Sequence, residues 1–177
     1  MKISNLNLVM QSYEFEDTRI RFINYASRLF QQVIILPDWQ ITYMKAFGKR
    51  EGISLVVEKG ASLSYRHNDQ LKKIGGWKFP VYDLGGENWL GVETIKHTIE
   101  AFEGFVPMSK LAHNVLAKFN GKIERITEVC FKGNKDTDIY SLFTETLLYN
   151  YFIGDQAAKN IVENGFEKVN ALISPNY

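Results

Sequence analysis

The chain has 177 residues, of which 45% are hydrophobic, 14% aromatic and 23% charged, and its formal net charge is +1. This composition is typical of a soluble globular protein that is long enough to bury a core, and it argues against an intrinsically disordered chain. The sequence also lacks the strongly basic balance that neutralises phosphates in nucleic-acid-binding proteins, so we expect no nucleic-acid partner.

The compartment is predicted from three features. The single cysteine, Cys130, excludes an internal disulfide and fits a reducing environment. The N-terminal residues MKISNLNLVM are too polar for the apolar segment of a signal peptide. The longest apolar run, Val33 to Leu36, is too short to span a bilayer. We therefore expect a cytoplasmic protein that makes no membrane contact.

An extended segment and one helix are predicted at the start of the chain. Residues 3–16 alternate between apolar and polar side chains, with a change of phase at Gln11 and Ser12 that indicates a bulge or tight turn. Apolar residues over 17–33 then recur at helical spacing. This spacing predicts an amphipathic helix that ends before Pro37, because proline cannot continue the helical hydrogen-bond pattern.

Short strands are predicted next. Residues 40–47, 53–58 and 61–66 alternate in polarity and are joined by turns that contain glycine, which is typical of an antiparallel meander. Residues 77–84 are predicted as a fourth strand, which Pro80 would restrict to a sheet edge or a bulge.

The second half of the chain is predicted to be mostly helical. The expected elements are, in order, helices over 92–102 and 109–119, a strand over 122–132, a turn over 133–138, a helix over 139–151, a short helix from Asp155 to Gly165, and a strand or tail over 166–173. The helix 139–152 is apolar around most of its circumference, so it is also a candidate for self-association.

Together these elements predict a single α+β domain over residues 1–177. In it an antiparallel β-meander packs against an N-terminal helix and a mostly helical C-terminal half.

The stretch Gly75–Glu93 lies where the spacing of apolar residues changes from strand to helix. It contains five glycines, two of the three tryptophans and three acidic residues. Neither GxGxxG nor GxxxxGK[ST] occurs in it, and Glu87 would repel an anion, so no nucleotide site is predicted. Either the tryptophans anchor a crossover to the core, or the stretch forms a binding surface. The candidate binding residues are Trp77, Tyr82, Asp83, Glu87, Asn88 and Trp89.

The sequence contains histidine, acidic and cysteine side chains that could take part in catalysis or bind a metal, but their spacing does not match a known catalytic or metal-binding motif. His67 with Asp69 resembles an acid/base pair, but this is also the composition of a surface turn. Glu93 and His97 lack the HExxH spacing of a zinc site. Cys130 has no neighbouring base and is predicted to be an inert thiol. We therefore predict no catalytic residue, no metal and no cofactor.

Two functions of different classes follow from these observations. The missing catalytic motif and the aromatic, acidic loop favour a non-enzymatic protein-binding module, such as an immunity- or inhibitor-type protein that occludes the surface of a protein partner. The alternative is a small hydrolase or transferase with a cleft around His67, Asp69, Asp83 and Glu93.

Overall fold

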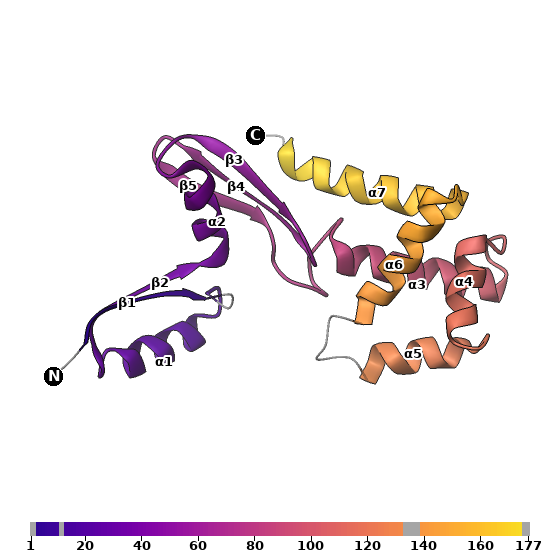
Figure 1. The fold of residues 1–177 in the computed structure, drawn as a ribbon, viewed down its shortest axis with the longest axis horizontal. Coiled ribbons are helices and arrows are strands. Elements are labelled where there is room, and N and C mark those ends of the chain that lie inside the picture. The colour runs from indigo at the N-terminus through magenta and orange to yellow at the C-terminus, as the bar shows by residue number, and fades with distance from the viewer. Residues whose placement is uncertain (1–2, 11–12, 133–138, 175–177) are drawn as a thin grey trace. The chain divides into compact units, whose positions relative to one another are not determined.

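The computed structural model describes residues 3–10, 13–132 and 139–174. Within these ranges the elements follow the order β1–α1–β2–α2–β3–β4–β5–α3–α4–α5–α6–α7 (Figure 1). The chain is thus α+β, as the sequence predicts. Contacts divide it into two compact units: unit 1 is Met1–Ser54 with Ser64–Lys73, and unit 2 is Leu55–Leu63 with Ile74–Tyr177. The single domain over residues 1–177 stays a prediction.

Unit 1 contains a parallel pair of strands, β1 (Ile3–Met10) and β2 (Phe30–Pro37). The helix α1 (Glu16–Ala26) connects them, as the crossover between parallel strands requires. The predicted helix 17–33 is therefore wrong over its last part. Its apolar spacing fits either structure, and the β-branched run at Val33 to Ile35 pairs with β1. The predicted bulge at residues 11–12 lies outside the described residues.

The helix α2 (Asp38–Phe47) follows β2 directly, so the predicted strand 40–47 is wrong. Tyr43 and Phe47 lie one helical turn apart, and their ring centroids are 5.2 Å from each other. Tyr43 is 0% exposed, and its hydroxyl donates a 2.7 Å hydrogen bond to the carbonyl of Arg50. Packing of this one aromatic face overrides the strand preference of the isoleucine, threonine and tyrosine in the segment.

The antiparallel meander consists of β3 (Gly52–Val57), β4 (Ala61–His67) and β5 (Gln70–Gly75) in that order. The predicted strands 53–58 and 61–66 are confirmed. The third strand is β5 rather than 40–47. Asn68 and Asp69 both have positive φ, 49° and 61°, which is the conformation of a two-residue hairpin turn.

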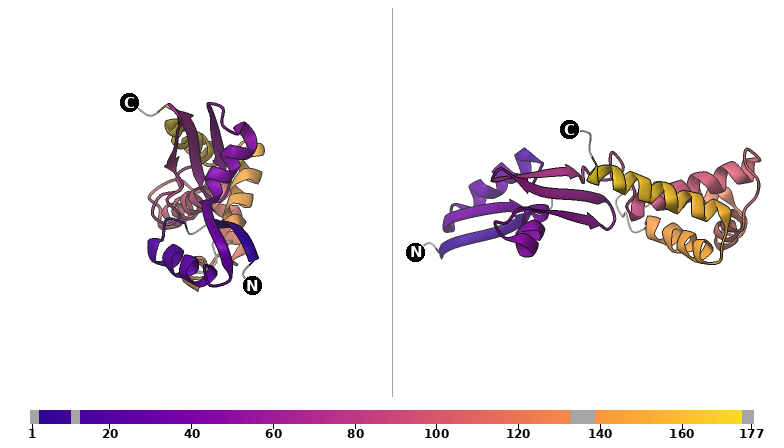
Figure 2. Two further views of the ribbon diagram at one scale, coloured as in Figure 1. Left: turned by 90° about the vertical axis from the view of Figure 1, so that its left-hand side faces the viewer. Right: turned by 90° about the horizontal axis from the view of Figure 1, so that it is seen from above.

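Unit 2 contains a bundle of five described helices. They are α3 (Glu87–Glu103), α4 (Lys110–Lys118), α5 (Ile123–Lys132), α6 (Ile139–Phe152) and α7 (Gln156–Ile173). The helix α3 packs against α4, α6 and α7, and Figure 2 shows α7 running alongside its neighbours in this unit. The predicted helices 92–102, 109–119 and 139–151 are confirmed, while the turn at 133–138 lies outside the described residues.

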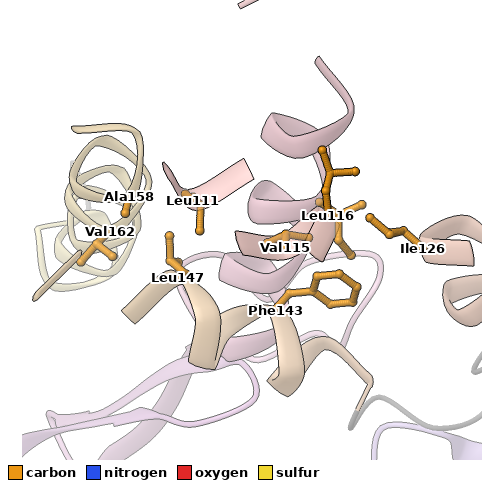
Figure 3. Packing of buried hydrophobic residues seen from close by; sticks show 9 residues of the cluster. Leu111, Val115, Leu116, Ile126, Phe143, Leu147, Ala158 and Val162 are labelled. Atoms are coloured by element: carbon orange, nitrogen blue, oxygen red, sulfur yellow. The ribbon is translucent and has the colours of Figure 1, made fainter. Parts of the chain in front are cut away.

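The core of unit 2 explains why α5 is a helix and not the predicted strand 122–132. Ile126 is 0% exposed and belongs to a cluster with Leu116 and Phe143. Figure 3 shows Ile126 pointing toward Leu116, with Phe143 below it. Ile123, Ile126 and Cys130 recur at helical spacing and pack on this cluster.

The helix α7 is continuous through Gly165, so the predicted stop at that glycine and the separate segment 166–173 are wrong. Asp155 is the N-cap, as predicted, and its carboxylate accepts the N–H of Ala158 at 2.8 Å. A Cβ at Gly165 would come within 2.9 Å of the Leu90 side chain of α3. The glycine therefore permits close helix packing instead of ending a helix.

No helix among the described residues is both long and apolar enough to cross a membrane. Self-association through helix 139–152 stays a prediction. Phe152 at the end of this helix is 80% exposed, whereas Phe143 and Leu147 are buried in the core.

Candidate functional site

The turn between β3 and β4 contacts the N-terminal end of α3 within unit 2. The backbone N–H of Glu87 donates to the carbonyl of Glu58 at 2.9 Å, and that of Asn88 donates to the carbonyl of Lys59 at 3.0 Å. The first amides of a helix have no partner inside the helix. Here two of them bind the turn, so they are not available to an anion. We call residues 58–61 and 83–88 the turn–helix junction.

Two glycines allow the backbones at the turn–helix junction to touch. A Cβ at Gly86 would lie 2.5 Å from the Cα of Gly60. A Cβ at Gly60 would overlap the carboxylate of Asp83. Only glycine fits such an approach, which gives the glycine-rich composition of this stretch a structural cause.

Asp83 connects the turn–helix junction to the loop that precedes it. Its Oδ1 accepts the backbone N–H of Lys78 at 3.2 Å. Lys78 has a φ of 76° and forms an isolated antiparallel bridge with Tyr82. The predicted strand 77–84 is therefore wrong, because the chain here turns back on itself around the Asp83 carboxylate.

Asn88 is a buried polar residue of the turn–helix junction whose side-chain oxygen makes no hydrogen bond within the described residues. The residue is 2% exposed. An acceptor left in this way costs about 1–3 kcal/mol. The neighbouring Glu87 carbonyl, in contrast, accepts the Thr144 hydroxyl of α6 at 2.8 Å. A hydrogen-bond donor that reached Asn88 Oδ1 would therefore be stabilising.

The six predicted binding residues separate into different environments. Asp83, Glu87 and Asn88 meet at the turn–helix junction. Trp77 and Tyr82 are 60% and 41% exposed in the preceding loop. The Trp89 ring lies near Gly165 of α7, where an added Cβ would be 3.4 Å from Cζ3. A binding role for the set stays a prediction.

The residues of the cleft predicted for a hydrolase or transferase lie at a strand end, in turns and in a helix, and two of them contact residues nearby in the sequence. His67 is the last residue of β4, and Asp69 lies in the turn between β4 and β5, in unit 1. The carbonyl of Asp69 accepts a 3.1 Å hydrogen bond from Arg66. Glu93, on α3 in unit 2, forms a 2.7 Å ion pair with Lys96.

Other titratable groups of the described chain do not assemble into a metal centre. His97 Nε2 lies 2.8 Å from the hydroxyl of Ser109, which itself caps α4. No group of three or more His, Cys, Asp or Glu side chains in the described ranges is placed to hold a metal ion. Burial raises the pKa of the half-buried Cys130 thiol, which disfavours the reactive thiolate.

Asp38 is a candidate residue that the sequence analysis missed. It follows the last residue of β2 and begins α2, with an exposed side chain. Its Oδ1 accepts the N–H of Trp39 at 2.8 Å, which orients the carboxylate. Ligands of α/β proteins bind at the carboxyl ends of parallel strands. Recognition of the run before Pro37 as a strand would have identified this position.

A groove of about 480 Å³ lies between α4 and α6. Asn114, Lys118, Glu145, Thr146 and Tyr149 line it. The amide of Asn114 donates to Oδ1 of the fully buried Asn150 at 2.9 Å, and Asn150 donates to the carbonyl of Thr146 at 2.8 Å. This network links Asn114 of α4 to Asn150 and Thr146 of α6.

Comparison with known proteins gives matches among solved structures. No family model matches the chain, and no curated protein matches it. A candidate N-acetylglucosamine kinase from Chromobacterium violaceum superposes with a TM-score of 0.73 at 19% identity, over 88% of this chain and 55% of that one. A candidate N-acetylglucosamine kinase from Porphyromonas gingivalis superposes with a TM-score of 0.66 at 14% identity, over 96% of this chain and 58% of that one.

The chain therefore shares its fold with these two proteins and spans a little over half of their length. This finding overturns the prediction of a non-enzymatic immunity- or inhibitor-type protein. The proteins with the same fold carry the name of an enzyme, and the prediction had rested on the absence of a catalytic motif in the sequence.

Proposed function

We propose that the chain forms part of a phosphotransferase that acts on a sugar hydroxyl, with N-acetylglucosamine as the first substrate to test. The observation that supports the proposal is the likeness to two candidate N-acetylglucosamine kinases over 88% and 96% of the chain. Because the chain spans 55% and 58% of those proteins, the proposal concerns the steps that its own residues could perform. The predicted cytoplasmic location belongs to the same proposal.

Asp38 is the residue that we assign to proton transfer. Phosphoryl transfer to a hydroxyl is assisted by a carboxylate that accepts the hydroxyl proton as the oxygen attacks phosphorus. Asp38 offers an exposed carboxylate at the carboxyl end of β2, with one oxygen oriented by the Trp39 N–H.

The turn–helix junction is the second part of the proposal. Its glycines bring two backbone segments into contact, and its buried Asn88 Oδ1 has no donor within the described chain. We assign this junction to holding a donor-bearing group, such as a hydroxyl, close to the start of α3. Glu87 and Asp83 disfavour a bare anion at the same place.

The test is an assay of the purified chain with ATP, Mg²⁺ and N-acetylglucosamine, in which sugar phosphate is detected by phosphorus NMR. We expect Asp38→Asn to lower kcat by about 10²–10⁴-fold, the usual contribution of a positioned base. Asp69→Asn is the matched control, because Asp69 is also an exposed unit 1 carboxylate and asparagine tolerates its φ of 61°.

An inactive wild-type chain would contradict the proposal that residues of this chain by themselves carry out the transfer. Equal activity of the Asp38→Asn and Asp69→Asn chains would remove Asp38 from the mechanism and leave the phosphotransferase assignment in place.

A further inference from the structure

The groove between α4 and α6 in unit 2 has walls that the core of this unit holds together. Its volume of about 480 Å³ is within the range of about 300–1,000 Å³ that is usual for small-ligand sites. Leu111 of α4 and Leu147 of α6 are both 0% exposed members of the buried cluster, and Figure 3 shows Leu147 pointing toward Leu111. Closely packed interiors are rigid, so the groove is preformed and does not need a ligand to open it.

Two opposite charges line this groove, one from each helix. Lys118 comes from α4 and Glu145 from α6, and both side chains are exposed. The two do not form an ion pair with each other, and neither makes a hydrogen bond or ion pair with another residue of the described ranges. A ligand with an anionic end at Lys118 and a cationic end at Glu145 would complement both charges.

Asn114 contributes an oriented carboxamide to the same groove. Its Nδ2 donates to Oδ1 of Asn150, which is 0% exposed, at 2.9 Å. This hydrogen bond uses one of the two N–H donors and leaves a second donor and the Oδ1 acceptor of Asn114. A peptide group presents one N–H and one C=O, so it matches these two groups. Thr146 adds no donor, because its hydroxyl already donates to the Leu142 carbonyl at 3.0 Å.

Tyr149 gives the groove an aromatic surface. It lies one helical turn after Glu145, so the two side chains share a face of α6. Tyr149 is 61% exposed and lines the groove. Its ring can cover an apolar side chain and can also attract an ammonium group bound at Glu145. This face of α6 therefore combines a site for a cation with a site for an apolar group.

We propose that the groove binds a short zwitterionic peptide, namely a dipeptide with an aromatic or aliphatic side chain. The ammonium group of the peptide binds Glu145, its carboxylate binds Lys118, its peptide group pairs with Asn114, and its side chain packs on Tyr149. A neutral ligand would leave both charges of the groove without a partner, and a ligand with one charge would leave one of them so. The site does not include Asp38 or the turn–helix junction, so it goes beyond the phosphotransferase proposal.

The experiment is a titration of the isotope-labelled, purified chain with glycyl-L-phenylalanine, followed through the backbone amide chemical shifts. We expect saturable shifts that are confined to α4 and α6. The blocked analogue N-acetyl-glycyl-phenylalaninamide keeps the side chain and the peptide groups but has neither terminal charge. It should produce no saturable shift at the same concentrations.

Neutral variants measure the contribution of each charge. We expect Lys118→Gln and Glu145→Gln each to raise Kd about 5–10-fold, the effect of one charge-assisted contact in a solvated groove. Lys110→Gln and Glu163→Gln are the matched controls. Both positions are exposed, lie in unit 2 and carry the same charges, but they do not line the groove, so the two variants should leave Kd unchanged.

Exchange of the two charges separates loss of binding from loss of folding. Lys118→Glu alone and Glu145→Lys alone should each abolish binding, because each gives the groove two like charges. The two substitutions in one chain should restore binding, with the peptide held in the opposite direction. Tyr149→Ala should remove the preference for glycyl-phenylalanine over glycyl-glycine and leave the charge dependence in place.

Absence of saturable shifts with glycyl-phenylalanine overturns the proposal. Equal affinity for the blocked analogue, or a double charge exchange that does not restore binding, also overturns it. N-acetylglucosamine that shifts the same amides with an affinity that Glu145→Gln leaves unchanged would identify the groove as a carbohydrate site instead. These readouts are amide shifts of α4 and α6, so they do not depend on the phosphotransferase assay.

Discussion

Asn88 and Asn150 are two buried asparagines of unit 2 with opposite hydrogen-bond status. Asn88 is 2% exposed, and its Oδ1 has no partner among the described residues. Asn150 is 0% exposed, accepts a hydrogen bond from Asn114 and donates one to the Thr146 carbonyl. Burial of an amide is favourable only when its hydrogen bonds are made. The two residues should therefore contribute to stability with opposite sign.

Replacement of each asparagine by leucine measures this difference. We expect Asn88→Leu to raise the free energy of unfolding by about 1–3 kcal/mol, because it removes an unpaired acceptor and keeps the volume. Asn150→Leu should lower it by a similar amount, because Asn114 and the Thr146 carbonyl lose their partner. Urea denaturation gives both values. A loss of stability in Asn88→Leu would instead indicate that Oδ1 is bound to an ordered water.

The elements of the chain differ in how far their sequence alone determines them. The strands β3 and β4 and the helices α3, α4 and α6 are predicted correctly, because their side-chain periodicity agrees with their turns and caps. α2, α5 and β2 are predicted wrongly. Each has β-branched or aromatic residues that fit two structures, and the packing of particular side chains decides between them. For α2 that packing is the burial of Tyr43, and for α5 it is the burial of Ile126.

The sequence likewise predicts only part of the candidate site. Composition alone identified the stretch with Asp83, Glu87 and Asn88. The partner turn at residues 58–60 could not be inferred, because nothing in its sequence indicates which helix its carbonyls bind. The sequence does not predict Asp38, because the apolar spacing that continues to Val33 fits a helix as well as the parallel strand β2.

Gly91 and Gly165 lie inside helices at positions where a neighbouring helix comes close. Gly→Ala in a helix interior normally stabilises by about 1 kcal/mol. At Gly91 of α3 the added Cβ would lie 2.6 Å from the backbone oxygen of Tyr140, which cannot move without α6. At Gly165 of α7 it would meet the end of the Leu90 side chain at 2.9 Å, and a side chain can rotate.

We therefore expect Gly91→Ala to lower the melting temperature more than Gly165→Ala does. Leu90→Ala should recover the helix-propensity gain in the Gly165→Ala background, which makes the two substitutions non-additive. Thermal unfolding of the single and double variants measures both effects. Equal destabilisation at the two glycines would contradict this account of the packing.

At the scale of the whole molecule, the two units differ in how much apolar surface they bury. Unit 2 contains the cluster formed by Leu111, Val115, Ile126, Phe143 and Leu147, all at most 1% exposed. In unit 1 the buried hydrophobic residues of the described chain are Ala26, Ile35 and Tyr43. Local stability follows buried apolar contact, so the two units should open with different free energies.

Hydrogen exchange tests this difference. Amides in α3, α4 and α6 should be the slowest to exchange, and those of α1 and β1 should be the fastest. Uniform protection across both units would contradict the unequal distribution of buried surface.

The hydrogen bonds of the turn–helix junction also couple the start of α3 to the β3–β4 hairpin. The first turn of α3 uses the carbonyls of Glu58 and Lys59 as acceptors for its Glu87 and Asn88 amides. The first amides of a helix have no acceptor inside the helix. Opening of the hairpin would therefore leave both amides without these partners, so a substitution that loosens the hairpin turn should also fray the N-terminal end of α3.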